Sequence, residues 1–152
     1  MTDGLRRATV DDRPAIEAVQ RAAYADTART IGRTPIPLEW DYGRVLEDWQ
    51  VWLSEDALGI TGVLIVNPRA EDLYLESIAV HPRVGGTGVG RVLMAAAETY
   101  ARRLGLPTVR LLTNELNVSR IAWYERCGFA IEFTERLDGR GIVHMLKRWD
   151  HG

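Results

Sequence analysis

The most informative stretch of the chain reads Val80-His81-Pro82-Arg83-Val84-Gly85-Gly86-Thr87-Gly88-Val89-Gly90-Arg91. An apolar pattern over 73–80 predicts a strand that leads into it, and a helical pattern over 89–104 predicts a helix that follows. Glycines allow the backbone to approach a ligand closely, and the N–H groups at a helix N-terminus attract an anion. The stretch therefore predicts a loop that binds a phosphate or pyrophosphate. A tight turn that binds nothing is the alternative, but such a turn needs only one or two glycines.

Two common phosphate-binding loops fail on specific residues. The dinucleotide fingerprint G-x-G-x-x-G would begin at Gly86 and Gly88, but it needs a glycine where Arg91 stands. A P-loop would use Gly85 and Gly90, but it needs Lys and then Ser or Thr, whereas Arg91 and valine follow. The glycines therefore indicate an anion-binding loop of a third kind.

The segments around this loop alternate between strand-like and helix-like patterns. On its N-terminal side we expect a strand over 5–10, a helix from an N-cap at Asp11-Asp12 to about Ala28, a loop or short helix start over 31–41, one or two helical turns over 42–47, and strands over 50–54 and 58–66. On its C-terminal side we expect a strand over 108–113, a helix over 118–127, and a hairpin of strands 129–135 and 142–147 across Asp138-Gly139. This order predicts an α/β domain with a mixed sheet.

Composition and charge exclude several classes of protein. The 152 residues are 46% hydrophobic and 26% charged, as in ordinary globular domains. Nineteen Lys and Arg against 21 Asp and Glu give a net charge of −2, so no basic excess is available for a nucleic-acid backbone. A single cysteine, Cys127, excludes an internal disulfide and a cysteine-cluster metal site. With no signal-peptide pattern and no apolar run of ~18 residues, we expect one domain over 1–152, soluble and cytoplasmic, without nucleic-acid, membrane or metal partners.

Residues 73–129 resemble the GNAT (N-acetyltransferase) superfamily. The first matching block runs Leu75-Glu76-Ser77-Ile78-Ala79-Val80-His81-Pro82 and continues as Gly86-Thr87-Gly88-Val89-Gly90-Arg91 into the predicted helix. The second block comprises Asn117, Ile121, Tyr124-Glu125-Arg126 and Gly128-Phe129. The resemblance implies a single-domain mixed sheet of about seven strands with about four helices, in which a cofactor cleft opens between two splayed parallel strands.

The resemblance also implies acetyl-CoA as the cofactor. It assigns cofactor binding to Ile78, Ala79 and Val80, whose backbone pairs with the pantetheine arm, to Gly86, Thr87, Gly88, Val89, Gly90 and Arg91, whose amides hold the pyrophosphate, and to Asn117. A plain helix N-cap is the alternative for Asn117, because Leu116 and Ile121 have the spacing of a hydrophobic staple. The chain departs from the family at Gly85, where Gln or Arg is usual, and at Arg120, where a small residue or Asn is usual.

Two residues are candidates for catalysis. Tyr124 matches the family tyrosine near the cofactor sulfur, where a phenol protonates the departing thiolate; the alternative is a core tyrosine. Glu76 lies on the cofactor-binding strand and is a candidate base for the attacking amine, directly or through water; the alternative is a solvated carboxylate, and His81 is an alternative base. Cys127 is expected to be structural, because a helix C-terminus disfavours a thiolate.

These residues imply an N-acyltransferase that transfers the acetyl group of acetyl-CoA to a primary amine of a small molecule or peptide by direct attack. An acyl-CoA-binding sensor without turnover and a nucleotide-binding protein that prefers ATP or NAD are the other hypotheses. Aromatic residues gather over 24–52, and the candidates there for acceptor binding are Trp40, Glu39, Asp41 and Tyr24. Aromatic side chains would pack the acceptor's apolar part, while Glu39 or Asp41 attracts its ammonium group. A homodimer is the family expectation.

Overall fold

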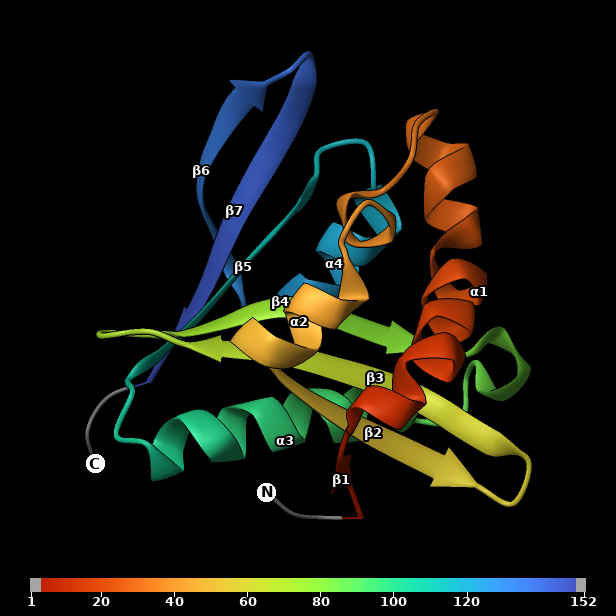
Figure 1. Cartoon of the computed structure of the whole chain (residues 1–152). Coiled ribbons are helices and arrows are strands. Elements are labelled where there is room, and N and C mark those ends of the chain that lie inside the picture. Colours follow the sequence, from red (N-terminus) through yellow and green to blue (C-terminus); the bar gives the residue numbers. More distant parts are fainter. Residues whose placement is uncertain (1–3, 150–152) are drawn as a thin grey trace.

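Seven strands form one mixed sheet in the computed structural model, which describes residues 4–149 (Figure 1). The strands are β1 (Arg6–Arg7), β2 (Gln50–Asp56), β3 (Gly59–Pro68), β4 (Leu73–Val80), β5 (Thr108–Asn114), β6 (Ala130–Leu137) and β7 (Arg140–Arg148). The helices are α1 (Arg13–Ile31), α2 (Tyr42–Asp48), α3 (Val89–Arg103) and α4 (Val118–Arg126), with short 3-10 helices η1 (Val10–Asp12), η2 (Ile36–Leu38) and η3 (Pro82–Val84). The strand order is β1-β2-β3-β4-β5-β7-β6. The predicted α/β fold is confirmed.

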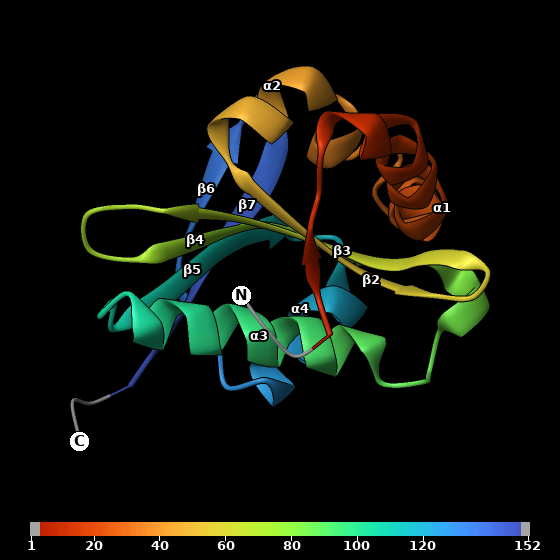
Figure 2. The same ribbon diagram turned by 60° about the horizontal axis from the view of Figure 1, so that its bottom comes forward.

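Separate clusters of buried apolar side chains cover the two faces of the sheet. Successive side chains of a strand point to opposite faces. Val51, Leu53, Val63 and Ile65 join the cluster of α1 and α2, whereas Trp52, Leu64 and Val66 join the cluster of α3. Figure 2 shows α1 and α2 on one side of the sheet and α3 and α4 on the other. The near-continuous apolar run of β3 is therefore buried on both faces, as predicted.

The two long helices follow from their apolar spacing and their ends. Leu93, Ala97 and Ala101 recur every four residues on α3 and are buried, where the helix packs on β3 and β4. The last residue of α1 is Ile31. Its C-cap is Gly32, whose φ of +71° lies in the left-handed region that glycine adopts without strain. This end lies three residues beyond the predicted one near Ala28.

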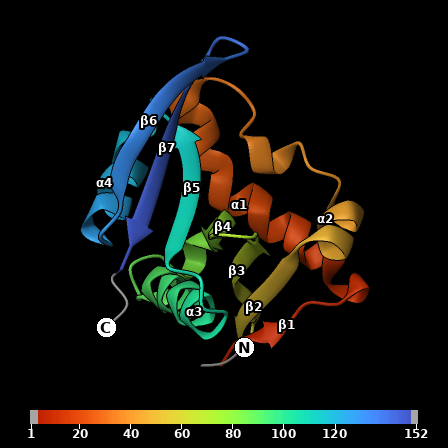
Figure 3. The same ribbon diagram turned by 90° about the vertical axis from the view of Figure 1, so that its left-hand side faces the viewer.

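The sheet divides between β4 and β5. These parallel strands pair only at Leu73 with Val109 and at Tyr74 with Arg110. Beyond these pairs β4 continues to Val80 without β5 beside it, and Figure 3 shows β5, β7 and β6 rising away from β4. The two parallel strands are thus splayed, as predicted.

A β-bulge falls on β4 inside the divided region. The register with β3 passes from Ser77 opposite Ile65 to Leu75 opposite Val66, so Glu76 is the extra residue. Bulges bend a strand and redirect side chains, and they occur often beside active sites.

The first strand is the main local error of the sequence prediction. We expected a strand over 5–10, but β1 covers only Arg6–Arg7. The backbone N–H of Thr9 donates to the side chain of Asp12 at 2.8 Å, and the resulting capping box starts η1 instead. The other predicted elements are present, with ends that differ by at most three residues. Within residues 4–149, no helix has both the length and the apolar character that crossing a membrane requires.

Candidate active site

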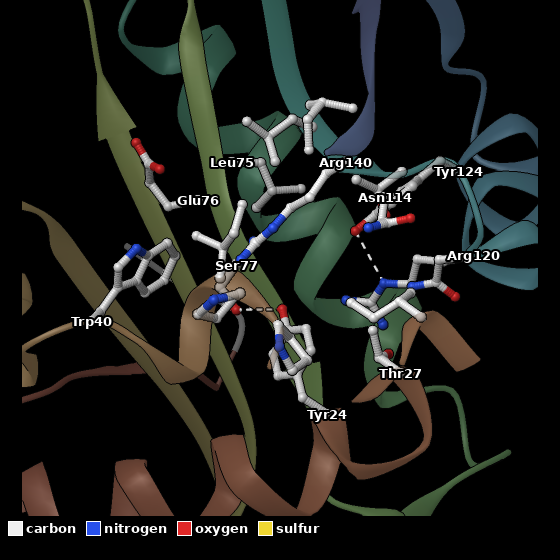
Figure 4. A pocket seen from close by; sticks show the side chains of 18 of the residues that line it. Tyr24, Thr27, Trp40, Leu75, Glu76, Ser77, Asn114, Arg120, Tyr124 and Arg140 are labelled. Carbon is white, nitrogen blue, oxygen red and sulfur yellow. Dashed lines mark hydrogen bonds between the residues drawn. The ribbon is translucent and has the colours of Figure 1, made fainter. Parts of the chain in front are cut away.

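Two cavities meet at α4. The first, which we call the glycine cleft, has a volume of about 430 Å³ and lies between the edge of β4, the loop at 84–88 and the start of α3. The second, the aromatic pocket, has a volume of about 190 Å³ and lies between α1, the segment 35–40, β4 and β7 (Figure 4). Arg120 of α4 lines both cavities. The two cavities therefore adjoin at its side chain.

The backbone of the glycine cleft suits an anion. Gly86 and Gly88 have φ values of +78° and +93°, which residues with a side chain rarely adopt. Gly88 is the N-cap of α3, so the first backbone N–H groups of this 15-residue helix have no acceptor within the helix. Together with the helix dipole, these donors attract a phosphate.

The edge of β4 supplies the other wall of this cleft. Ile78 and Val80 line it, and the carbonyl of Ile78 accepts a hydrogen bond from Nη2 of Arg120. The predicted cofactor residues Gly86, Gly88, Val89, Gly90 and Arg91 also line the cleft. Ala79 and Thr87 do not, because Ala79 is buried in the core and the Thr87 hydroxyl turns to the carbonyl of Val84. An unpaired strand edge beside a glycine-rich helix start fits a pantetheine arm that ends in a pyrophosphate.

Tyr124 lines the aromatic pocket beside Arg120, the residue that lines both cavities. Its hydroxyl accepts a hydrogen bond from Nε of Arg120 at 3.1 Å. Its ring packs against Phe129 and Trp123, at centroid distances of 5.9 Å and 5.4 Å. Because a guanidinium group has only donors, the Tyr124 oxygen must be the acceptor, and its own proton is free for another acceptor.

Glu76 lines the aromatic pocket from the bulge of β4. Its Oε2 accepts a hydrogen bond from Nδ2 of Asn67 at 3.3 Å. Burial raises the pKa of this carboxyl group, although the bond from Asn67 and the charge of Arg69 oppose the shift. A raised pKa makes a carboxylate a stronger base.

A chain of buried hydrogen bonds fixes the wall formed by α1. The hydroxyls of Tyr24 and Ser77 lie 2.8 Å apart, and Nε2 of Gln20 donates to the Ser77 hydroxyl at 3.1 Å. Nε2 of Gln20 also donates to the Tyr42 hydroxyl at 2.8 Å, which in turn donates to the carbonyl of Pro37. The pocket wall is therefore tied to β4 and to η2.

Comparison of the sequence with models of protein families identifies the family of this chain. Residues 14–129 match the family model described as the acetyltransferase (GNAT) family. The chain belongs to the GNAT family. The resemblance seen in the sequence is thereby confirmed.

Relatives and solved structures agree with this family. A mycothiol acetyltransferase of Salinispora arenicola is 42% identical over 65 residues, which are 42% of this chain and 20% of that protein. The uncharacterized N-acetyltransferase YvbK of Bacillus subtilis is 26% identical over 86 residues, 57% of this chain and 54% of that protein. The chain thus spans between a fifth and about half of the length of these relatives.

Two solved structures cover nearly the whole chain. The PaiA N-acetyltransferase of Thermoplasma acidophilum, in complex with coenzyme A, has a TM-score of 0.80 at 18% identity and covers 98% of this chain and 100% of that one. The ribosomal-protein-S18-alanine N-acetyltransferase of Escherichia coli has a TM-score of 0.77 at 20% identity, covering 97% and 94%. At these identities the likeness establishes a shared GNAT fold.

The predicted acceptor residues of this GNAT chain separate into two pairs. Trp40 and Tyr24 line the aromatic pocket, and Trp40 packs edge-on against Trp49 at 5.1 Å. Glu39 and Asp41 do not line it. Oε1 of Glu39 accepts from Nη2 of Arg140 at 3.2 Å, and Asp41 caps α2 by accepting from the backbone N–H of Gly43 at 2.9 Å.

Asn117 has the position of an N-cap without its hydrogen bond. It precedes α4, but its buried side chain makes no capping bond and lines the aromatic pocket rather than the glycine cleft. Sequence reasoning did not assign the pocket residues Arg140, Ser77 and Asn114. Ser77 lies inside the matching block, which was a usable signal, whereas nothing near Arg140 in the sequence points to a pocket.

Metal binding or thiol chemistry would depend on the placement of His, Cys, Asp and Glu side chains. Between residues 4 and 149, no three His, Cys, Asp or Glu side chains gather as a metal site would require. Burial raises the pKa of the Cys127 thiol, which disfavours the nucleophilic thiolate.

Proposed function

We propose that this GNAT chain is an N-acetyltransferase that moves the acetyl group of acetyl-CoA to a primary amine of a small molecule or peptide. The observation that carries the proposal is the hydrogen bond from Arg120 to Tyr124 where the two cavities adjoin. It leaves the phenol proton available at the point where an acyl group bound in the cleft would meet an amine bound in the pocket. Family membership and the coenzyme A complex of the PaiA enzyme support the choice of cofactor.

Binding of the cofactor would use the backbone of the glycine cleft. Acetyl-CoA supplies an acetyl group activated as a thioester. The amides from Gly86 to Arg91 would hold its pyrophosphate, and the free edge of β4 at Ile78 and Val80 would hydrogen-bond its pantetheine arm, while the backbone of Ala79 between them faces β3. Because the carbonyl of Ile78 already accepts from Arg120, the arm would use the remaining groups of this edge or displace that contact.

The proton transfers follow from the two predicted catalytic residues. As the amine nitrogen bonds to the acetyl carbon and the carbon–sulfur bond breaks, Glu76 accepts the proton from the amine, directly or through a water molecule. Tyr124 donates its hydroxyl proton to the departing sulfur. Backbone N–H groups at Ile78 and Val80 would stabilise the negative charge on the acetyl oxygen.

Arg120 would affect the amine through its charge. Its guanidinium lies near the rings of Tyr24, Trp123 and Tyr124, and it donates hydrogen bonds to the Tyr124 hydroxyl and to the carbonyl of Ile78. A nearby positive charge disfavours an ammonium ion and favours the neutral amine. The neutral form is the one that attacks a thioester, so Arg120 would raise its population.

Binding and turnover test the proposal separately. We expect acetyl-CoA at 100 times its Kd to raise the Tm by about 5–10 °C, since such binding adds about 2.7 kcal/mol. ATP and NAD should give no comparable shift. Release of the coenzyme A thiol in the presence of an amine panel then measures transfer. Binding of acetyl-CoA without turnover of any amine would favour the sensor hypothesis, and stabilisation by ATP or NAD alone would overturn the cofactor assignment.

A further inference from the structure

The aromatic pocket has an excess of positive charge. The guanidinium groups of Arg120 and Arg140 line it, whereas Glu76 is the one acidic residue among its described lining residues. One carboxylate can balance only one of these two cations. A simple alkylammonium ion that entered this pocket would meet two like charges, although Arg140 is paired with Glu39 outside the pocket lining.

Arg140 has an unused hydrogen-bond donor in this pocket. It is the first residue of β7, directly after the hairpin turn, and its side chain extends into the pocket in Figure 4. The side chain is 15% exposed, and Nη2 donates to Oε1 of Glu39 at 3.2 Å. Its Nε is buried and has no hydrogen-bond partner among the described residues.

The two nitrogens concerned belong to the same side of the guanidinium group. The N–H of Nε and one N–H of Nη2 point in parallel directions and match the two oxygens of a carboxylate. Glu39 occupies one of these donors through a single oxygen and leaves the other unsatisfied. A buried donor without an acceptor is unfavourable. The arrangement therefore favours an incoming group that fills both donors at once.

Glu39 is able to give up this contact. Its side chain is 51% exposed at the end of η2, so its carboxylate can turn to water at little cost in solvation. The ion pair that it makes with Arg140 is long and uses one hydrogen bond. A bidentate carboxylate would make the stronger pair.

We infer, building on the proposed N-acetyltransferase function, that the acceptor is an amine that also carries a carboxylate, which Arg140 binds through Nε and Nη2 in place of Glu39. Such an acceptor brings its own negative charge into a pocket with two guanidinium groups. Its amine then lies toward Tyr124 and Glu76, with Trp40 beside the carbon chain that joins the two ends. Arg140 is thus a specificity-determining residue and takes no part in the proton transfers.

Matched acids and amides test this inference by binding. Glycine, β-alanine, γ-aminobutyric acid and larger α-amino acids, each beside its primary amide, are titrated by calorimetry into the protein saturated with coenzyme A. The amide keeps the size and the amine but removes the negative charge. We expect at least one acid to bind about tenfold more tightly than its amide, as loss of a bidentate charged pair implies.

Three variants assign the preference to Arg140. In Arg140→Met the ratio of acid to amide affinity should fall to about one. Glu39→Gln should tighten acid binding, because it removes the competing carboxylate. Arg33→Met is the matched control: Arg33 also contacts the 138–140 hairpin, through the carbonyl of Asp138 at 3.3 Å, but does not line the pocket. It should keep the preference.

Four outcomes would overturn the inference: equal binding of acid and amide throughout the series, no binding of any acid, a preference that survives in Arg140→Met, or a preference for succinyl-CoA over acetyl-CoA that disappears in Arg140→Met. The last would place the carboxylate on the acyl group instead of the acceptor. Acetyl transfer, measured by thiol release with amines that carry a carboxylate and with amines that do not, tests the proposed function independently. Acid-selective binding that depends on Arg140 without any acetyl transfer would overturn that function and leave Arg140 as a carboxylate site.

Discussion

Nε of Arg120 donates a hydrogen bond of 3.1 Å to the hydroxyl oxygen of Tyr124, one helical turn further along α4. The same guanidinium donates through Nη2 to the carbonyl of Ile78 on β4. Arg120 thus connects the phenol to the strand edge that faces the cleft. Its position, where GNAT proteins usually have a small residue or Asn, gives this chain a local arrangement that the family pattern does not imply.

Replacing Tyr124 with Phe removes the proposed proton donor and little volume. We expect kcat to fall about 100-fold, the size of a typical general-acid contribution, while the Kd for acetyl-CoA changes by less than about twofold. Steady-state kinetics and calorimetry measure the two quantities. Tyr100→Phe on α3, which lines neither cavity, is the control. Unchanged kcat in Tyr124→Phe would remove the phenol from the mechanism.

Replacing Arg120 with Met separates stability from activity. Arg120 is half-buried, and its charge has hydrogen-bond acceptors but contributes little net stability, so the free energy of unfolding should stay within about 1 kcal/mol of the wild type. The proposed lowering of the amine pKa by Arg120 should be lost. The pKa of the bound amine, read from the pH profile of kcat, should therefore increase. Urea unfolding and kinetics between pH 6 and 10 measure both; an unmoved ionisation would contradict the role given to the charge.

Glu76→Gln tests the proposed base. Burial raises the pKa of Glu76 above its ordinary value, and the base is active when deprotonated, so kcat should increase as pH rises through this raised pKa. In Glu76→Gln this rise of kcat with pH should disappear, and kcat should fall about tenfold to 100-fold. The exposed Glu71→Gln serves as the matched control. If the rise of kcat with pH persists in Glu76→Gln, another group is responsible for it.

Asp72→Asn tests how much the ion pairs of Asp72, beside the paired ends of β4 and β5, contribute to stability. Oδ1 and Oδ2 of Asp72 accept from Arg69 at 2.6 Å and 2.7 Å, and Oδ2 also accepts from Arg110 at 2.9 Å. The hydrogen bonds from Arg69 and then Arg110 lower the pKa of this buried carboxyl group against the opposing effect of burial. The variant should lose about 2 kcal/mol of stability at pH 7.

The pH dependence of that loss follows from the lowered pKa. The folded state holds the proton of Asp72 less tightly than the unfolded state, so the stabilisation is complete above the unfolded pKa of about 3.9 and is lost as pH falls through the lower folded value. Urea unfolding at pH 7 and at pH 3 should show the difference between wild type and Asp72→Asn shrinking. Asp48→Asn, whose partner Arg44 is exposed, should cost less than about 0.5 kcal/mol. A pH-independent loss would assign the effect to packing.

Local patterns predicted the fold and the glycine cleft because the signals were local. The glycines at 85–90 and the apolar strand before them determine the loop that they form. Tyr124 lies on α4, the second helix after this loop. The aromatic pocket was predicted only in part, because its walls come from distant segments. Glu39 and Arg140 lie 101 residues apart, and they meet only once the last hairpin has folded over η2. Asp41 illustrates the opposite error: an acidic residue beside aromatics was assigned to the ligand, but it caps its own helix.

Only two residue pairs join β4 to β5. The sheet therefore consists of two hydrogen-bonded units, one of β1, β2, β3 and β4 and the other of β5, β7 and β6. Few backbone bonds cross the boundary, so each unit can open without breaking the ladder of the other. Their coupling depends instead on Asp72 with its two arginines at one end and on the helices that pack across both. Fluctuations in the angle between the units then change the width of the aromatic pocket, which β4, β5 and β7 line. A ligand that bridges them would slow amide hydrogen exchange in β5 and β7 as well as in β4, although it touches only one edge of each unit.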